Sequence, residues 1–186
     1  MRSLLCLPLL LLTGASTPAV RYAIDPAASE VSARVAFLGL ASKTARFPKM
    51  SGGIALDPNR LDRIDLAVEL DARALTAGDS VTLARLKGPA FFDVVNHPTV
   101  SFRGSAMAMT GPATATVPGE ITARGVTRPA VLAVTFDKPP AQASGRAPID
   151  LTARTTIDRR QFGMTSYGLI VGSKVKITIR ARMAPG

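Results

Sequence analysis

The sequence predicts an all-β protein, an antiparallel barrel or sandwich of about eight to ten strands with one short helix. Apolar and polar residues alternate in many short segments separated by turn residues, which is typical of antiparallel strands with one buried face. Strands and helices do not alternate along the chain as they do in parallel sheets. A barrel of about eight strands is favoured because the strands are long and closure leaves no unpaired edge.

The predicted interior contains few large side chains. The strand faces consist mostly of Ala, Val, Ile and Leu, and the chain has seven Phe, two Tyr and no Trp. A barrel of about eight strands is either filled by its own side chains or holds one small ligand. Because empty space costs about 24 cal/mol per Å³, we expect the walls to collapse together or another molecule to fill the middle.

The first 19 residues have the pattern of a secretory signal peptide. Arg2 precedes a leucine-rich run over residues 4–12, and small residues lead to Ala19. The run is too short to span a bilayer. We therefore expect residues 20–186 to form one exported domain, periplasmic or secreted. Cys6 is the chain's only cysteine and lies in this leader, so the mature chain has no thiol for a disulfide, a nucleophile or a thiolate metal site.

Alternation over residues 20–87 predicts five strands and a helix. The strands are expected at residues 22–25, 30–37, 43–47, 54–56 and 63–71. Residues 38–42 interrupt the alternation, and residues 50–53 are expected to form a turn. Residues 79–87 predict the short helix, which Asp79 or Ser80 can cap and Gly88 ends.

Residues 88–102 hold three of the seven Phe and the only His. Phe91 and Phe92 are adjacent, so on a strand they would point to opposite faces. In a turn or short helix, both rings can lean onto one apolar surface. We interpret the segment, which lies between the predicted helix and the next strand, as a plug whose two rings cover an apolar surface. The alternative is that Phe91 and Phe92 are two ordinary core residues.

The rest of the chain predicts further strands and turns. The strands are expected at residues 99–103, 106–109, 114–117, 120–123, 130–136, 147–157 and 175–181. Gly104 and the Pro118-Gly119 pair are read as breaks, and residues 124–129 as a turn. Between the last two strands lie residues 158–164 and then a poorly patterned stretch that ends at Gly172.

The charge of the mature chain is strongly basic. Without the leader it has 22 basic and 13 acidic residues, a formal charge of +9. Such a balance suits nucleic acid, an anionic membrane surface or acidic polymers, and export argues against nucleic acid. Lys174, Lys176, Arg180 and Arg182 share one face of the last strand. They form either a solvated outer wall or a surface for transient contact with an anionic membrane.

The usual catalytic and metal-binding patterns are missing from the sequence. One His and no mature Cys exclude the familiar protein-only zinc sites, and no nucleophile-elbow motif occurs. His97 is interpreted as a hydrogen-bonded loop histidine, with a hydrolase built on it as a minor alternative. We expect a protein that is not an enzyme and needs no cofactor.

Seven short motifs occur in the order of a known family. They are Tyr-x-Ile-Asp-Pro-x-x-Ser at 22–29, Leu-Gly-Leu at 38–40, Phe-Phe-Asp-Val at 91–94, Pro-Thr-Val-Ser-Phe at 98–102, Gly-Val-Thr-Arg-Pro at 125–129, Thr-Thr-Ile-Asp-Arg at 155–159 and Phe-Gly-Met at 162–164. On these motifs, nearly the whole mature chain resembles the YceI-like, or polyisoprenoid-binding, family. Arg124 and Gln161 stand where relatives often have a histidine and an acid, and residues 82–86 lack the family's acid and histidine.

The resemblance implies an extended, lipocalin-like barrel that holds an isoprenoid quinone, an isoprenoid alcohol or a similar lipid. A ligand-free structural or stress-response envelope protein is the alternative. The oligomeric state is left open. The candidate wall residues, chosen by pattern and resemblance, are Val35, Phe37, Leu38, Phe47, Phe91, Phe92, Phe102, Phe162 and Met164.

Overall fold

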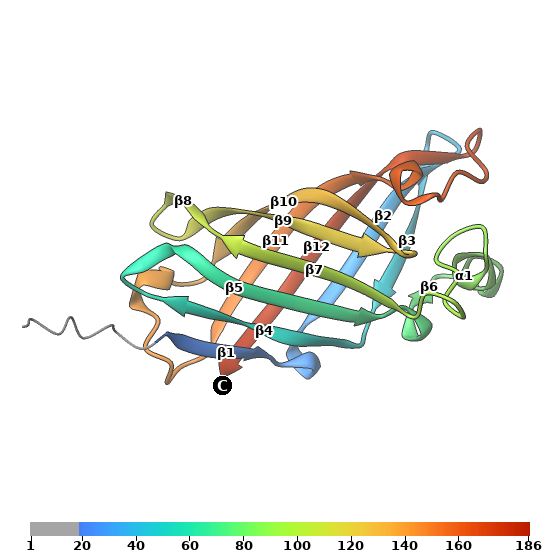
Figure 1. Ribbon diagram of the computed structural model, residues 1–186. Coiled ribbons are helices and arrows are strands. Elements are labelled where there is room, and N and C mark those ends of the chain that lie inside the picture. The colour runs from blue at the N-terminus through green and yellow to red at the C-terminus, as the bar shows by residue number, and fades with distance from the viewer. Residues whose placement is uncertain (1–18) are drawn as a thin grey trace, which may run out of the picture.

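The computed structural model describes residues 19–186, so the expected leader lies almost entirely outside the described residues. In this part of the chain, twelve antiparallel strands form one sheet and a single α-helix, α1 (Ser80–Lys87), lies at one end (Figure 1). The strands are β1 (Val20–Ile24), β2 (Glu30–Phe37), β3 (Ala41–Phe47), β4 (Met50–Asp57), β5 (Arg60–Asp71), β6 (Thr76–Ala77), β7 (Thr99–Ala106), β8 (Ala108–Gly111), β9 (Thr114–Ala123), β10 (Val126–Phe136), β11 (Ile149–Asp158) and β12 (Val171–Pro185).

The sheet closes into a barrel because β1 pairs with both β4 and β12. Eight strands form the closed ring, in the order β1, β4, β5, β7, β9, β10, β11 and β12. The prediction of an antiparallel barrel of about eight strands with one short helix is confirmed. Closure pairs the edges that an open sheet would leave exposed.

β12 is long enough to pair with two strands on the same side. Its last residues pair with β1, and its first part pairs with β2 from Val171 to Arg180. From β2 the sheet continues through β3 to β6, beyond the closed ring. We call β2, β3 and β6 the arm. The arm leans toward the end of the barrel where α1 lies, which we call the α1 end (Figure 1).

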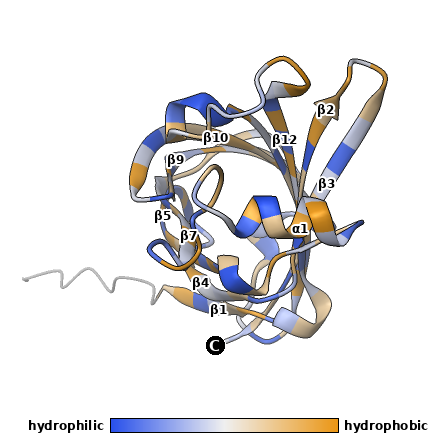
Figure 2. Ribbon diagram, turned by 90° about the vertical axis from the view of Figure 1, so that its right-hand side faces the viewer, coloured by the Kyte–Doolittle hydropathy of each residue, from blue (hydrophilic) through white to orange (hydrophobic). Residues whose placement is uncertain are grey.

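Alternation along the strands creates the core. In β5, Ile64 and Leu70 are buried while Asp65 and Glu69 are exposed, as the pattern of the sequence predicts. Viewed along the barrel, α1 lies across the opening at its end (Figure 2). The helix begins where the Asp79 carboxylate accepts the Thr82 N–H at 2.7 Å, so the predicted cap is confirmed.

Three predicted turns or breaks lie inside strands. Residues 50–53 belong to β4, Gly104 belongs to β7, and the Pro118-Gly119 pair belongs to β9. A Cβ at Gly119 would stand 2.3 Å from the Arg103 carbonyl oxygen and 2.5 Å from the Phe102 ring. The glycine therefore marks a close approach of neighbouring strands and not a turn. The predicted turn at 124–129 is only Arg124 and Gly125, because β10 already starts at Val126.

Candidate functional site

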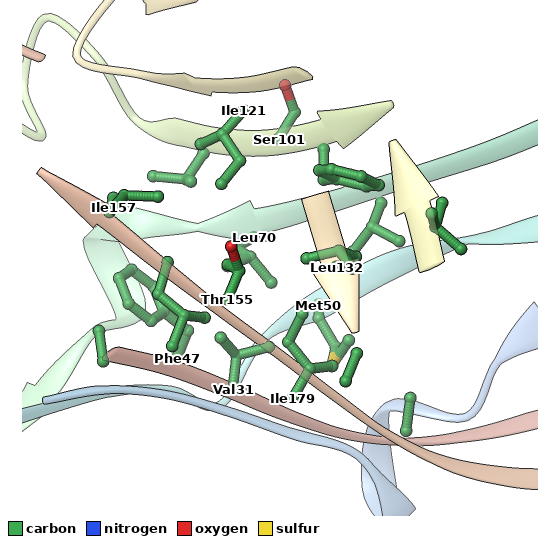
Figure 3. Close-up of a pocket in the computed structure, with 18 of the residues that line it drawn as sticks. Val31, Phe47, Met50, Leu70, Ser101, Ile121, Leu132, Thr155, Ile157 and Ile179 are labelled. Atoms are coloured by element: carbon green, nitrogen blue, oxygen red, sulfur yellow. The ribbon is translucent and has the colours of Figure 1, made fainter. Parts of the chain in front are cut away.

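The main cavity occupies the middle of the barrel. Its volume is about 170 Å³, and its wall is almost entirely hydrocarbon. Most of its lining comes from inward-facing residues of the ring strands (Figure 3). Thr155 on β11 and Arg159 are among the few polar residues there. A dry cavity of about 150 Å³ with aliphatic and aromatic walls accepts a small apolar molecule such as benzene, so this cavity suits a hydrocarbon group.

A second cavity of about 210 Å³ lies at the α1 end, between the arm, α1 and residues 164–171. Its floor is apolar and includes Val35, Phe91 and Phe92. Its rim is polar, with Lys43 and Arg85 among the lining residues. The two cavities therefore differ in chemistry: the inner one offers hydrocarbon only, and the outer one combines hydrocarbon with charge.

Phe92 and Met164 belong to a partition between the two cavities. The partition consists of the five residues that line both cavities, which are Ala33, Phe92, Arg159, Met164 and Val175. The ring of Phe92 meets that of Phe47 edge-on, with centroids 5.6 Å apart. The part of the partition that Phe92 and Met164 form is therefore apolar.

The plug predicted at residues 88–102 lies at this partition. Phe91 is buried and stacks on Tyr167, with ring centroids 5.9 Å apart. Phe92 is half-buried and faces both cavities. The two rings thus share one apolar region despite being adjacent, because residues 88–97 form tight turns in which the Asp93 carbonyl accepts the His97 N–H at 2.8 Å.

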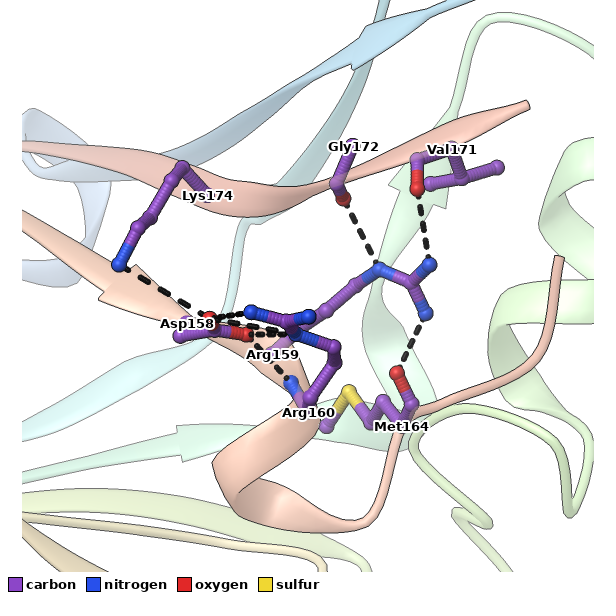
Figure 4. A network of polar contacts seen from close by, with 7 residues as sticks. All are labelled: Asp158, Arg159, Arg160, Met164, Val171, Gly172 and Lys174. Carbon is purple, nitrogen blue, oxygen red and sulfur yellow. Dashed lines mark hydrogen bonds and ion pairs between the residues drawn. The ribbon is translucent and has the colours of Figure 1, made fainter. Parts of the chain in front are cut away.

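Arg159 stands buried beside the partition, only 4% exposed. It begins η4 (Arg159–Phe162), which follows β11. Its guanidinium donates to the carbonyls of Met164, Ser166, Val171 and Gly172, three of which are drawn in Figure 4. It also lies 5.8 Å from the centre of the Phe91 ring. Burial lowers its pKa from the usual value, and no carboxylate pairs with it among residues 19–186.

Asp158 organises the other side of η4. Its carboxylate accepts from the backbone N–H and the guanidinium of Arg160, with Lys174 3.8 Å away (Figure 4). The hydrogen bond from the Arg160 side chain holds the pKa of this carboxyl well below its usual range. At the rim of the outer cavity, the Lys43 ammonium lies 2.8 Å from the Asp79 carboxylate and its hydrogen bond lowers the pKa of that carboxyl.

The structure distributes the predicted wall residues between the two cavities. Phe47, Phe102 and Phe162 line the main cavity, and Val35, Phe37 and Phe91 line the outer one. Phe92 and Met164 line both. Leu38 lines neither: it lies in the β2–β3 turn with its side chain 61% exposed. Alternation ends at Phe37, and the positive φ of 52° at Leu38 turns the chain away from the barrel.

Pattern reasoning missed two functional residues of the site. Arg159 follows directly after a strand, and nothing in the alternation distinguishes it from the exposed Arg160. Tyr167 lies in the poorly patterned segment, and its contacts with Phe91 and Arg85 join parts of the chain far apart in sequence. The shared Thr-Thr-Ile-Asp-Arg motif at 155–159 is the only signal that included Arg159.

Arg124 connects three segments of the chain. Its guanidinium donates to the carbonyl of Pro89 at 2.8 Å and to that of Gly163. His97 lies outside both cavity linings, with its ring beside Gly125. Within residues 19–186 there is no cluster of three or more metal-ligating side chains. No helix in that range is both long and apolar enough to cross a membrane.

A closed antiparallel ring around a dry cavity defines a class of β-barrels with lipophilic interiors. Within that class, the chain belongs to the YceI-like domain family, whose model matches residues 22–183. A UPF0312 protein of Pseudomonas putida strain GB-1 is 26% identical over 160 residues, which are 85% of this chain and 83% of that protein. A UPF0312 protein of Pseudomonas savastanoi has the same identity and coverage.

Two solved structures share the fold. BcnA of Burkholderia cenocepacia is 23% identical and superposes with a TM-score of 0.76, covering 86% of this chain and 98% of BcnA. A polyisoprenoid-binding domain of Saccharophagus degradans is 13% identical with a TM-score of 0.70, covering 90% and 99%. At these identities the similarity shows the common barrel.

Proposed function

We propose that the protein binds one isoprenoid or similar long apolar chain, such as an isoprenoid quinone or alcohol, for sequestration or transport. The observation that carries the proposal is the apolar cavity in the middle of the barrel, which the partition separates from a second, partly apolar cavity. Burial supplies the binding energy, at about 0.8 kcal/mol for each CH₂ removed from water. The polyisoprenoid-binding domain with the same fold supports this ligand class.

The geometry favours a ligand that extends through both cavities. The main cavity of about 170 Å³ matches one small hydrocarbon group and not a long chain. A longer ligand therefore passes Phe92 and Met164 and continues into the outer cavity. There its polar end meets Lys43, Arg85 and the hydroxyl of Thr82. In the proposed complex, the apolar tail lies inside the barrel and the polar head lies at the α1 end.

The test begins with organic extraction and native mass spectrometry of freshly purified protein, followed by titration of the extracted protein with isoprenoid quinones and alcohols. Ala153→Leu, which fills the main cavity, is expected to weaken binding at least tenfold. Thr152→Leu, the control, places the same side chain at the neighbouring position of β11, outside the lining of the main cavity. Absence of extractable lipid together with absence of binding would favour the ligand-free envelope protein.

We also propose that the protein is exported and that its signal peptide is cleaved after Ala19. The support is the charged, leucine-rich and small-residue order of residues 1–19. Expression in a bacterium with an outer membrane, followed by fractionation, is expected to recover the protein in the periplasm or medium with Val20 at its N-terminus. Intact Met1 on cytoplasmic protein would contradict export.

A further inference from the structure

Two loops that touch each other carry the two most exposed apolar side chains of the α1 end. Leu40 in the β2–β3 turn and Leu169 before β12 are both fully exposed, whereas Leu38 is 61% and Tyr167 43% exposed. The two loops are joined by the Leu38 N–H, which donates to the Ile170 carbonyl at 2.8 Å. We call Leu38, Leu40, Tyr167 and Leu169 the apolar tip. Clustered exposed apolar residues usually mark an interaction surface.

The apolar tip is held in place and is not a frayed loop. The buried guanidinium of Arg159 binds four carbonyls on either side of Leu169. Tyr167 is stacked on Phe91, and its carbonyl accepts the N–H groups of Ile170 and Val171 at 3.0 and 2.8 Å. A buried cation thus fixes the conformation of the loop that carries Leu169. Because Leu169 itself is exposed, it does not contribute to the packing of the core.

The surroundings of the apolar tip are cationic. Residues 31–47 and 159–176, which contain both loops, include no Asp or Glu but seven Lys and Arg. The carboxylates beside these segments are Glu30, Asp79 and Asp158, which pair with Arg46, with Lys43, and with Arg160 and Lys174. Seven cations against three carboxylates leave a cationic excess. Apolar side chains surrounded by cations match the surface of an anionic bilayer, where the apolar groups enter the acyl boundary and the cations meet the head groups.

The second cavity opens at the same place. Val81 and Tyr167 are exposed and also line that cavity, together with Arg85 at its rim. We propose that the apolar tip docks the barrel end-on to an anionic lipid bilayer, with the outer cavity facing the membrane. The inference goes beyond ligand binding, because docking requires no lipid in the barrel. It also assigns a partner to Leu38, which the cavities do not use.

The absence of Trp from the chain allows a direct test by single tryptophan reporters. Leu40→Trp and Leu169→Trp, freed of lipid by extraction, are mixed with vesicles of equimolar phosphatidylglycerol and phosphatidylcholine. Both emission spectra are expected to shift to shorter wavelength, and brominated phosphatidylcholine is expected to quench both. Val131→Trp, an exposed site on β10 in the side wall, is the matched control and is expected to stay unchanged.

A second variant measures how much the leucines contribute. Leu38→Ser, Leu40→Ser and Leu169→Ser combined are expected to reduce vesicle co-sedimentation at least tenfold, with Val131→Ser as the control. The same triple variant is expected to bind isoprenoid from detergent solution normally, which separates failure of docking from failure of the proposed function. Circular dichroism verifies that the variant folds.

Three results would overturn the inference. One is sedimentation with anionic vesicles while both tip reporters remain in water, which would mean contact through the side wall. Another is absence of sedimentation at low salt. The third is a spectral shift without vesicles that grows with protein concentration and accompanies dimers in ultracentrifugation, which would assign the apolar tip to a second copy of the chain.

Discussion

Arg159 shows how one residue fixes both the cavity and the loop above it. A guanidinium has five N–H donors in a planar fork, and here it donates to four carbonyls, those of Met164 and Ser166 in the loop before β12 and those of Val171 and Gly172 at the start of β12. Lysine offers three donors at one point and cannot span these carbonyls. The charge remains beside the Phe91 ring, where the face of the ring attracts a cation.

Replacing Arg159 is therefore expected to be costly. Arg159→Met leaves four carbonyls without their donor and is expected to lower the free energy of unfolding by about 3 kcal/mol or more. Arg159→Lys is expected to recover only part of this loss. Arg128→Met, at an exposed arginine, is the control with an expected effect within about 0.5 kcal/mol. Urea denaturation measures all three, and equal midpoints would contradict the structural role.

Asp158 makes the stability depend on pH. The hydrogen bonds from Arg160 lower its pKa in the folded chain, whereas an unfolded Asp titrates near about 3.9. The unfolded chain thus binds more protons, so the contribution of Asp158 is fully present above that value and is lost as pH falls toward the folded pKa. The thermal denaturation midpoints of wild type and Asp158→Asn are expected to differ at pH 7, and the difference is expected to shrink progressively as the pH falls below about 4. A constant difference would contradict this.

At the scale of elements, the plug and the arm decide access to the interior. Phe92 borders both cavities, while Val68 borders only the main one. Phe92→Ala is expected to weaken isoprenoid binding more than Val68→Ala, because it removes the ring that closes the partition. Phe91→Ala, which empties a buried site, is expected to cost about 3 kcal/mol of stability as well. Equal affinities of all three variants for isoprenoid would mean that Phe91 and Phe92 are ordinary core residues with no special role in binding.

Alternation predicted the strands because one face of each is buried in a continuous ring, as in β5. It failed at glycines. Gly52 was read as part of a turn, yet a Cβ there would stand 2.1 Å from the Ala67 carbonyl oxygen of the neighbouring strand. A glycine required by close approach of two strands has the same local sequence as one required by a turn.

The candidate site was predictable only where it coincides with strands. Phe47 and Phe102 alternate with polar neighbours and lie in the wall. The placement of Leu38, by contrast, depends on a hydrogen bond to Ile170, more than a hundred residues away. Arg159 likewise depends on carbonyls of a loop without any pattern. Contacts between loops arise from the closed topology, which local periodicity does not encode.

At the scale of the whole molecule, the two ends of the barrel differ in charge. At the α1 end the cations of residues 31–47 and 159–176 outnumber the carboxylates that pair with them, whereas the loops at the other end include Asp57 and Asp137 among their charges. β12 runs from the α1 end to the other end (Figure 1). Its row of four cations therefore divides into Lys174 and Lys176 near the apolar tip, and Arg180 and Arg182 far from it.

This division separates end-on docking from contact through the side wall. Reversing all four cations to Glu is expected to slow lipid uptake from anionic vesicles and leave uptake from detergent nearly unchanged. If the barrel docks end-on, Lys174→Glu with Lys176→Glu accounts for most of that effect, and Arg180→Glu with Arg182→Glu for little. Lys174 lies near Asp158, and Arg182 lies near Asp150. Each double variant therefore removes one cation that is near a carboxylate, so the two variants are matched in this respect.

Salt supplies the final control on the charge contribution. Attraction between exposed charges weakens as the screening length falls from about 10 Å at 0.1 M to about 3 Å at 1 M. Co-sedimentation of the wild type is expected to decline over this range, and that of the Lys174→Glu, Lys176→Glu variant to start low and change little. Salt does not screen the insertion of the apolar side chains of Leu40 and Leu169 into the bilayer. Some vesicle binding is therefore expected to remain at high salt in the wild type and in the charge variants, and to be lost in the triple serine variant. Equal effects of the two charge pairs would instead indicate that the barrel lies on its side.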